Sequence, residues 1–196
     1  NLQSNKLYFV ANPFVNLEGS GDPRLTNVFA AVPPGTIISI WNESAPLPAY
    51  DNYTRASRGN WVGAALTATV KRADGVFIRM PATNTPVDLF LMGEVPDRFT
   101  APSNFISRIP GISMIGHPYP VTVRLTNTAM ASAVPNGTII SIWNPNTTQY
   151  VNYTKASRGN WVGDALTAEL QPGQGLVIRA TNAANGWYEN KPYTWP

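Results

Sequence analysis

The chain contains no cysteine, and its 196 residues include a single histidine. Without thiols, the protein can form neither disulfides nor thiolate metal sites. A lone histidine supports neither a Ser-His-Asp triad nor a zinc site of the usual kind. The sequence therefore predicts no bound metal and no cofactor.

Charged residues and long apolar runs are also scarce. Charged residues make up 13% of the chain, against about 25% in ordinary soluble domains. The net charge of +3 is spread without a basic cluster, which argues against nucleic acid as a partner. No apolar stretch approaches the roughly 20 residues that a membrane-spanning helix needs. A neutral polar surface of this kind suits packing against other protein surfaces.

The most informative feature that is present is a repeated octapeptide. Ala-Ser-Arg-Gly-Asn-Trp-Val-Gly occurs at residues 56–63 and again at 156–163. The match continues on both sides, and the length differences fall between matched segments, where loops tolerate them. We predict one β repeat over residues 1–97 and a second over residues 98–196. They form either two small domains or one pseudo-twofold sandwich with a shared core.

Within each copy, the apolar residues recur at the period of β-strands. Residues 66–70 and 166–170 alternate between apolar and polar side chains, which predicts half-buried strands. The Ile-Ile-Ser-Ile-Trp segments at 37–41 and 139–143 are apolar on both faces, which predicts strands covered on both sides. With 18 prolines and 15 glycines, no long helix is expected. The predicted fold class is all-β, an internally duplicated β-sandwich or barrel.

The repeat also tests for catalytic residues, because an active site older than the duplication should leave its acids in both copies. No aligned pair keeps a carboxylate: Asp74 aligns with Gln174, and Glu169 with Thr69. An acid/base pair of the glycosidase type is therefore not expected, and we predict that the protein is not an enzyme. A site assembled by folding in one copy stays open, from Asp22, Asp88, Glu94 and Asp97.

Aromatic residues are kept in both copies. Two tryptophans in each copy lie in or beside an expected strand, so we predict that they anchor the core. Exposed platforms for sugar rings are the alternative. The four residues are Trp41, Trp61, Trp143 and Trp161.

Basic residues are kept as well. Arg79 and Arg179 end apolar strands and are expected to bond loop carbonyls. We assign a local role to Arg58 and Arg158, in the turn before the second tryptophan of each copy, with contact to a partner as the alternative. The only histidine, His117, aligns with Asn12 in a turn, which favours a structural role.

Five Asn-X-Ser/Thr sequons occur, slightly more than the composition would give by chance. Surface glycosylation is therefore an option for a secreted protein. The acceptor residues are Asn42, Asn52, Asn136, Asn146 and Asn152.

The order of motifs resembles a known repeat. A Pro-Gly-Thr strand ending in Trp-Asn is followed by Gly-x-Trp, Pro-Gly-x-Gly-x-x-Ile-Arg and a closing Gly-Glu-Val. This is similar to a tandem β-rich repeat of predicted secreted, largely uncharacterised bacterial proteins. Here the Leu-x-Pro-Gly form is complete only at 170–175, and Gly-Glu-Val occurs only at 93–95. The resemblance implies a secreted β protein and no assigned activity.

The copies differ most at their ends. The apolar segment 87–95 is expected to form the closing strand of copy one, whereas copy two ends in a polar, proline-containing tail at 187–196. We expect copy two to lack a full closing strand and to leave an edge open to another chain. The residues expected to cross between subunits are Asn1, Leu2, Gln3, Trp187, Tyr188, Tyr193 and Trp195.

Our first functional hypothesis is a secreted, non-enzymatic structural protein that forms a homopolymer: an extracellular filament, tube or surface layer. A chain that starts with asparagine rather than methionine is expected to be the product of signal-peptide removal. A carbohydrate-binding module that uses the tail aromatics on a polysaccharide is the alternative. A third hypothesis is a virion structural subunit.

Overall fold

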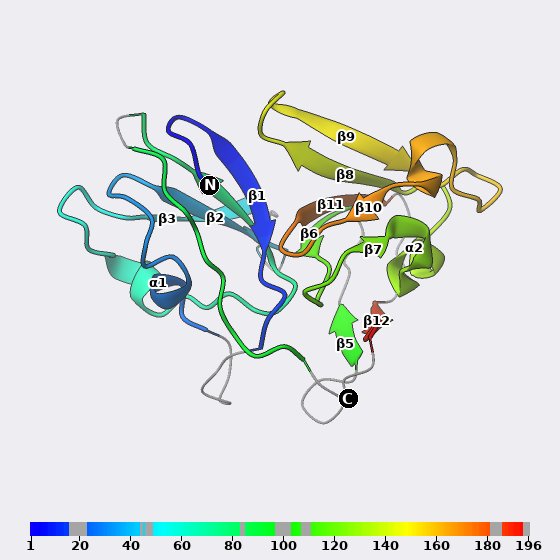
Figure 1. The fold of residues 1–196 in the computed structure, drawn as a ribbon, viewed down its shortest axis with the longest axis horizontal. Coiled ribbons are helices and arrows are strands. Elements are labelled where there is room, and N and C mark those ends of the chain that lie inside the picture. Colours follow the sequence, from blue (N-terminus) through cyan, green and yellow to red (C-terminus); the bar gives the residue numbers. More distant parts are fainter. Residues whose placement is uncertain are drawn as a thin grey trace.

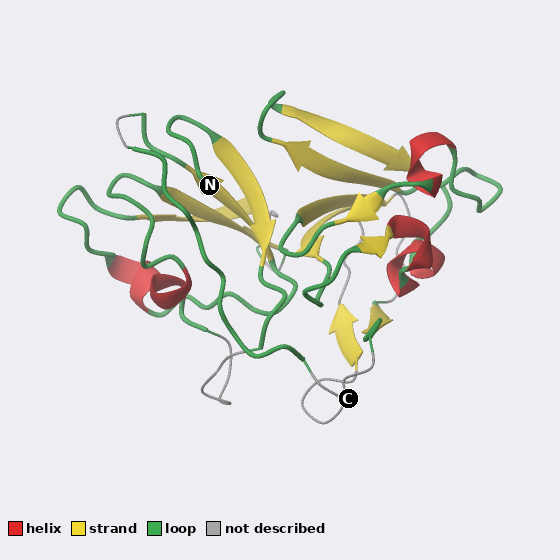
Figure 2. Ribbon diagram, viewed as in Figure 1, coloured by secondary structure: helices red, strands yellow, loops and turns green. Residues whose placement is uncertain are grey.

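The computed structural model describes residues 1–15, 23–43, 45, 49–82, 85–96, 111–180 and 186–193, and the backbone of 103–106. The chain is built from antiparallel sheets, with only short helices at its periphery (Figures 1 and 2). The predicted all-β class is therefore confirmed, and the sheets form a sandwich. The helices are α1 (Leu25–Val28) and α2 (Ala129–Ala133).

Two four-stranded sheets make up the body of the protein. The first has the strand order β1-β4-β2-β3, and the second has the corresponding order β6-β11-β8-β9. The strands of the first sheet are β1 (Leu7–Ala11), β2 (Ile37–Asn42), β3 (Ala49–Thr54) and β4 (Gly75–Arg79). Those of the second are β6 (Gly111–Gly116), β8 (Ile139–Asn144), β9 (Gln149–Thr154) and β11 (Gly175–Ala180).

Shorter elements close the ends of the sheets. The remaining strands pair two by two, β7 with β10 and β5 with β12. Their bounds are β5 (Ser103–Ile106), β7 (Val123–Arg124), β10 (Glu169–Leu170) and β12 (Trp187–Asn190). The 3-10 turns are η1 (Gly63–Leu66), η2 (Leu125–Asn127) and η3 (Gly163–Leu166).

Apolar side chains gather in three clusters. One cluster packs against one face of the first sheet and includes Ile38, and a second packs against one face of the second sheet and includes Ile140. We call the parts of the chain that contain the first and the second sheet the first and the second half. The third lies between the sheets and contains Phe9, Phe77 and Val177, with the two phenylalanine rings stacked 4.2 Å apart. Each large sheet is therefore apolar on both faces, as the sequence of its central strands predicts.

The two halves cover each other's edge strands by matching contacts. The Trp143 indole donates to the Leu7 carbonyl of β1, and the Trp41 indole donates to the Ile112 carbonyl of β6. At the other end of β1, the Ala11 amide donates to the carbonyl of Gly173. Because these contacts engage outward groups of Leu7 and Ala11 in β1 and of Ile112 in β6, neither strand is left as a fully open edge.

The two alternating segments do not form strands over their expected length. Leu66 and Leu166 lie in 3-10 turns and are about half exposed. The reason is local: the glycine that opens each turn, Gly63 in the first half, has a φ of 60°, which ends the extended conformation. Of the two alternating segments, only Glu169–Leu170 forms a strand.

Segment 87–95 also differs from its expected conformation. It runs across the first sheet (Figure 1), its backbone is bonded through the bridges Leu2–Val87 and Val15–Glu94, and Asp88 accepts a hydrogen bond from the Asn1 side chain. The neighbouring strand β1 already uses its outward groups for contacts with the second half, so no continuous edge is left for pairing. The segment therefore lies over the sheet as a strap, a name we keep for residues 87–95.

Candidate functional site

The tail of copy two is integrated into the fold. Trp187–Asn190 forms β12 and pairs with β5, so the expectation that copy two lacks a closing strand was wrong. Trp187 lies in the core of the second half, and its indole donates to the Glu189 carboxylate. Its side chain is therefore available neither to another subunit nor to a sugar.

The other expected interface residues do not form one surface. Leu2 is a buried core residue that bridges to Val87, so its side chain is not at an interface. Tyr193 is half-buried, and its hydroxyl donates to the carbonyl of Pro96. Asn1, Gln3 and Tyr188 are exposed, whereas Trp195 lies outside the described residues.

The four tryptophans fall into two kinds. Trp61 and Trp161 are buried in the cores of their halves. Trp41 and Trp143 are half-buried and reach across to the opposite half, so they join the two halves rather than anchor a single core. Each of the latter pair meets a tyrosine edge-on at 5.0 Å, Trp41 with Tyr50 and Trp143 with Tyr150.

The basic residues also act differently from expectation. Arg179 does not bond loop carbonyls: its Nη2 donates to Ser141 Oγ and Asn152 Oδ1, at 3.2 and 3.4 Å. The carbonyl-binding role belongs instead to Arg55 and Lys155, which each bond several loop carbonyls. Lys155 Nζ donates to the carbonyls of Ala131, Ser132 and Val134 at 2.8–3.1 Å. The signal in the sequence was that a basic residue is kept at this position in both copies.

Sequence reasoning missed Glu189, the most completely buried carboxylate described. It is 4% exposed. Its Oε1 accepts from the Ala129 amide at 2.8 Å, and its Oε2 from the Met130 amide at 3.0 Å and from the Trp187 indole. The carboxylate thus lies at the N-terminus of α2 and Lys155 at its C-terminus, the arrangement that the helix dipole favours. Nothing in the sequence pointed to Glu189, because it lies in a tail that has no matching copy.

His117 lies beside this carboxylate. Its Nδ1 is 3.2 Å from the carbonyl of Tyr119, which can only accept, so Nδ1 carries the proton. Its Nε2 is 4.0 Å from Glu189 Oε1. A cavity of about 360 Å³ opens next to both side chains. Because two N–H groups at the start of α2 and the Trp187 indole donate to the carboxylate, the group holds α2 in place.

The stability of the protein should depend on pH through His117. Burial is the main cause that lowers the pKa of this imidazole below its ordinary value of 6.5, although Tyr119 and Glu189 oppose the shift. The unfolded chain therefore binds this proton more readily, and stability falls as the pH drops below about 6.5. The variant His117→Asn, which copies Asn12, should lose this component. Urea unfolding at pH 7.5 and 5.5 checks it, and an equal loss in both proteins would contradict it.

Of the four acidic residues that the sequence left open as a site in one copy, the structure describes two, and these two have different partners. Asp88 lies 3.8 Å from the terminal amine of Asn1, and Glu94 bridges to Val15. Asp22 and Asp97 lie outside the described residues. Within the described part of the chain, no group of three or more histidine or acidic side chains is placed to hold a metal ion.

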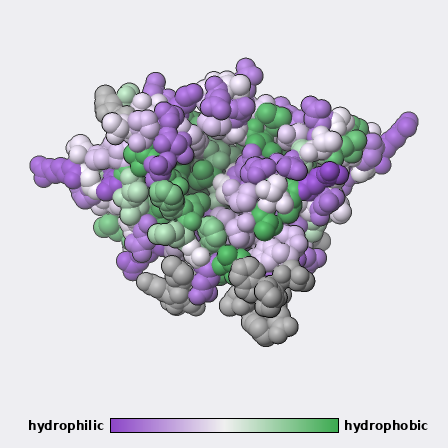
Figure 3. All heavy atoms as spheres, in the orientation of Figure 1, coloured by the Kyte–Doolittle hydropathy of each residue, from purple (hydrophilic) through white to green (hydrophobic). Residues whose placement is uncertain are grey.

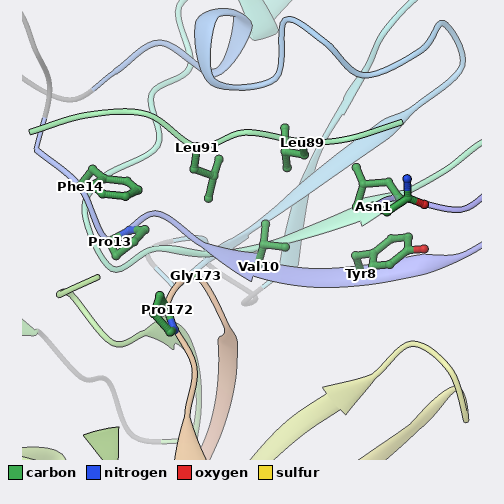
Figure 4. A pocket seen from close by; sticks show the side chains of 10 residues that line it. Asn1, Tyr8, Val10, Pro13, Phe14, Leu89, Leu91, Pro172 and Gly173 are labelled. Carbon is green, nitrogen blue, oxygen red and sulfur yellow. The ribbon is translucent and has the colours of Figure 1, made fainter. Parts of the chain in front are cut away.

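An apolar groove lies between the strap and β1 (Figure 4). Its volume is about 380 Å³. Leu89 and Leu91 of the strap point into it from one side and Val10 of β1 from the other. The alternate strap residues, Phe90 and Met92, are 73% and 82% exposed, more than any other large apolar side chain described. Figure 3 shows apolar residues gathered over this part of the surface.

The asparagines of the five sequons differ in the hydrogen bonds that their side chains make. Asn42 and Asn136 use their side-chain nitrogens in hydrogen bonds to Asp51 and Ser157. Asn52 and Asn152 accept a hydrogen bond from a serine of the neighbouring strand, 2.6 Å in each half. Asn146 lies exposed in the turn between β8 and β9, where a glycan would meet the least protein.

No protein family, curated protein or solved structure matches this chain. None of the helices in the described residues is long and apolar enough to cross a membrane. The case for a function therefore rests on the surfaces described above.

Proposed function

We propose that this protein is a non-enzymatic structural protein that assembles with copies of itself outside the cell. The observation that carries the proposal is the strap. Two large apolar side chains, Phe90 and Met92, are almost fully exposed on it, next to an apolar groove. Soluble monomers seldom present contiguous apolar surface without a partner for it.

A second copy of the chain suits this surface. The exposed side chains and the groove adjoin each other, because the strap that carries Phe90 and Met92 also forms the rim of the groove through Leu89 and Leu91. A two-fold axis beside the strap would place the apolar side chains of each copy over the groove of the other. Such a self-complementary contact is isologous and uses one surface twice.

The test is to replace Phe90 and Met92 together by serine. We expect self-association to weaken at least tenfold in sedimentation velocity, because each side chain loses the apolar area that it buries on contact. Val62→Ser with Leu66→Ser is the matched control, since these side chains are half exposed on a different surface. Wild-type protein that stays monomeric at high concentration, or equal assembly of the two variants, would contradict the proposal.

Carbohydrate binding is the second candidate, and the structure moves it away from the tail. Tyr50 and Tyr150 are 39% and 41% exposed. Burial raises the pKa of both phenols; the neighbouring Tyr150 phenol adds to the rise at Tyr50, and Arg179 partly opposes the rise at Tyr150. These rings and the guanidinium suit a sugar. Retention of the strap variant, Phe90→Ser with Met92→Ser, on insoluble polysaccharide would favour this module.

A further inference from the structure

A homopolymer needs more than the strap contact. An isologous contact joins two copies and is then used up, so growth beyond a dimer needs a second self-complementary surface elsewhere on the chain. That second surface lies on a sheet edge, and its assignment rests on the proposed self-assembly. It is supported by a separate observation, namely which edge strands of the sheets are contacted by other parts of the chain and which are open.

Strand β9 is the outer strand of the second sheet. The amide of Lys155 donates to the Thr138 carbonyl at 2.9 Å. By the alternation of an antiparallel ladder, Tyr150 and Asn152 therefore turn their N–H and C=O groups away from β8. Beyond Asn152 the edge is covered, because Lys155 bridges to Trp161. The open stretch is thus centred on Val151.

The open stretch lacks the devices that protect edge strands. Residues 149–154, Gln-Tyr-Val-Asn-Tyr-Thr, contain no proline, glycine or charged side chain, and all six pair with β8 without a bulge. Natural proteins usually blunt such an edge, since it is a template for another strand. Within the part of the chain that the structure describes, hydrogen bonds from the opposite half reach the edges of β1 and β6, and none reaches the edge of β9.

The matching strand of the first sheet differs at the centre. Val151, which is 42% exposed, faces Ile142 of β8, whereas Asp51 takes the same position opposite Ile40 in β3. Two β3 strands paired about this position would set Asp51 against its own copy, and like charges directly opposite are destabilising. Two β9 strands would set valine against valine.

We propose that β9 strands of two copies pair antiparallel about a two-fold axis at Val151. Tyr150 of each copy then exchanges backbone hydrogen bonds with Asn152 of the other, about four bonds in all. The second sheets of the two copies become one continuous sheet. Strap contacts and β9 contacts alternate along the polymer, whereas Asp51 keeps β3 out of it.

The test replaces Val151 by aspartate, which gives β9 the central residue of β3. We expect the wild-type polymer to become a dimer in sedimentation velocity, and the same change combined with the two strap substitutions to give monomers. Val62→Asp is the matched control, because Val62 is 53% exposed in the first half of the chain, outside β9 and the strap, and its variant should still polymerise. Val151→Lys should act as Val151→Asp does, which guards against a folding defect of one variant.

The two proposals fail separately. Polymers of unchanged length from Val151→Asp would overturn the β9 contact and leave the strap contact standing. Unchanged polymers from the strap variant would overturn the strap contact instead. Hydrogen exchange gives an independent readout on wild-type protein: assembly should slow the exchange of the Tyr150 and Asn152 amides. Equal exchange of these amides in polymer and monomer would also overturn the β9 contact.

Discussion

Replacing Glu189 with alanine should cost about 3–5 kcal/mol of folding stability, because three N–H groups lose their acceptor and each unsatisfied buried donor costs about 1–3 kcal/mol. Two amides at the start of α2 and the Trp187 indole would lose their acceptor inside the protein. A buried donor without a partner carries its full desolvation cost. The effect should concentrate in the second half, because Glu189 joins β12 to α2.

Urea unfolding followed by tryptophan fluorescence measures this loss. Glu169→Ala is the control, since Glu169 is exposed on β10, and it should change stability by less than about 0.5 kcal/mol. Glu189→Gln should fall between the two, because the amide keeps one acceptor oxygen but presents an NH₂ group to backbone donors. Equal stability of Glu189→Ala and Glu169→Ala would show that the carboxylate does not hold α2.

The second large effect is expected from Gly116→Ala. A Cβ at position 116 would overlap the Cβ of Ala11 and lie 3.0 Å from the Gln174 carbonyl oxygen. Ala11 and Gly116 end the two matching edge strands and meet where the halves touch. Overpacking of this kind costs about 3 kcal/mol, and we expect that loss in thermal or urea unfolding.

A second substitution tests the cause. Ala11→Gly in the Gly116→Ala background removes the overlapping methyl group and should recover more than half of the lost stability. Ala11→Gly alone should cost less than the clash, because it removes only one methyl group from the contact. Failure of the double variant to recover would place the cause in the Gln174 contact or in the backbone of β6.

The strands of each half were predictable where the pattern was local. The central strands around Ile38 and Ile140 are apolar on both faces, and the glycines before them, Gly35 and Gly137, have φ values of 84° and 81°. Such turns need a residue that tolerates positive φ, and only glycine does so without strain. The core positions of Trp61 and Trp161 follow from the same pattern of β-strand and turn.

The sequence-based predictions that failed did so because they depended on contacts between distant parts of the chain. The strap and segment 66–70 have strand-like composition, but a strand also needs a free edge to pair with. The contact of β1 with the second half removed that edge for the strap, and a positive φ at Gly63 ended the extended backbone near Leu66. The polar composition of the tail did not predict β12. The strand can bury Glu189 only because amides of α2, far away in the sequence, donate hydrogen bonds to its carboxylate.

The sequence by itself determined the β class and the buried positions of Trp61 and Trp161, since these depend on the period of side chains along each strand and on turn glycines. Tertiary structure decided which edges stay open. Whether β1, β6 or β9 is free depends on groups far away in the chain, such as the Trp143 indole on Leu7. For the same reason, three features could be recognised only in the folded chain. They are the exposed strap, the buried Glu189 and the uncharged centre of the open strand β9 at Val151.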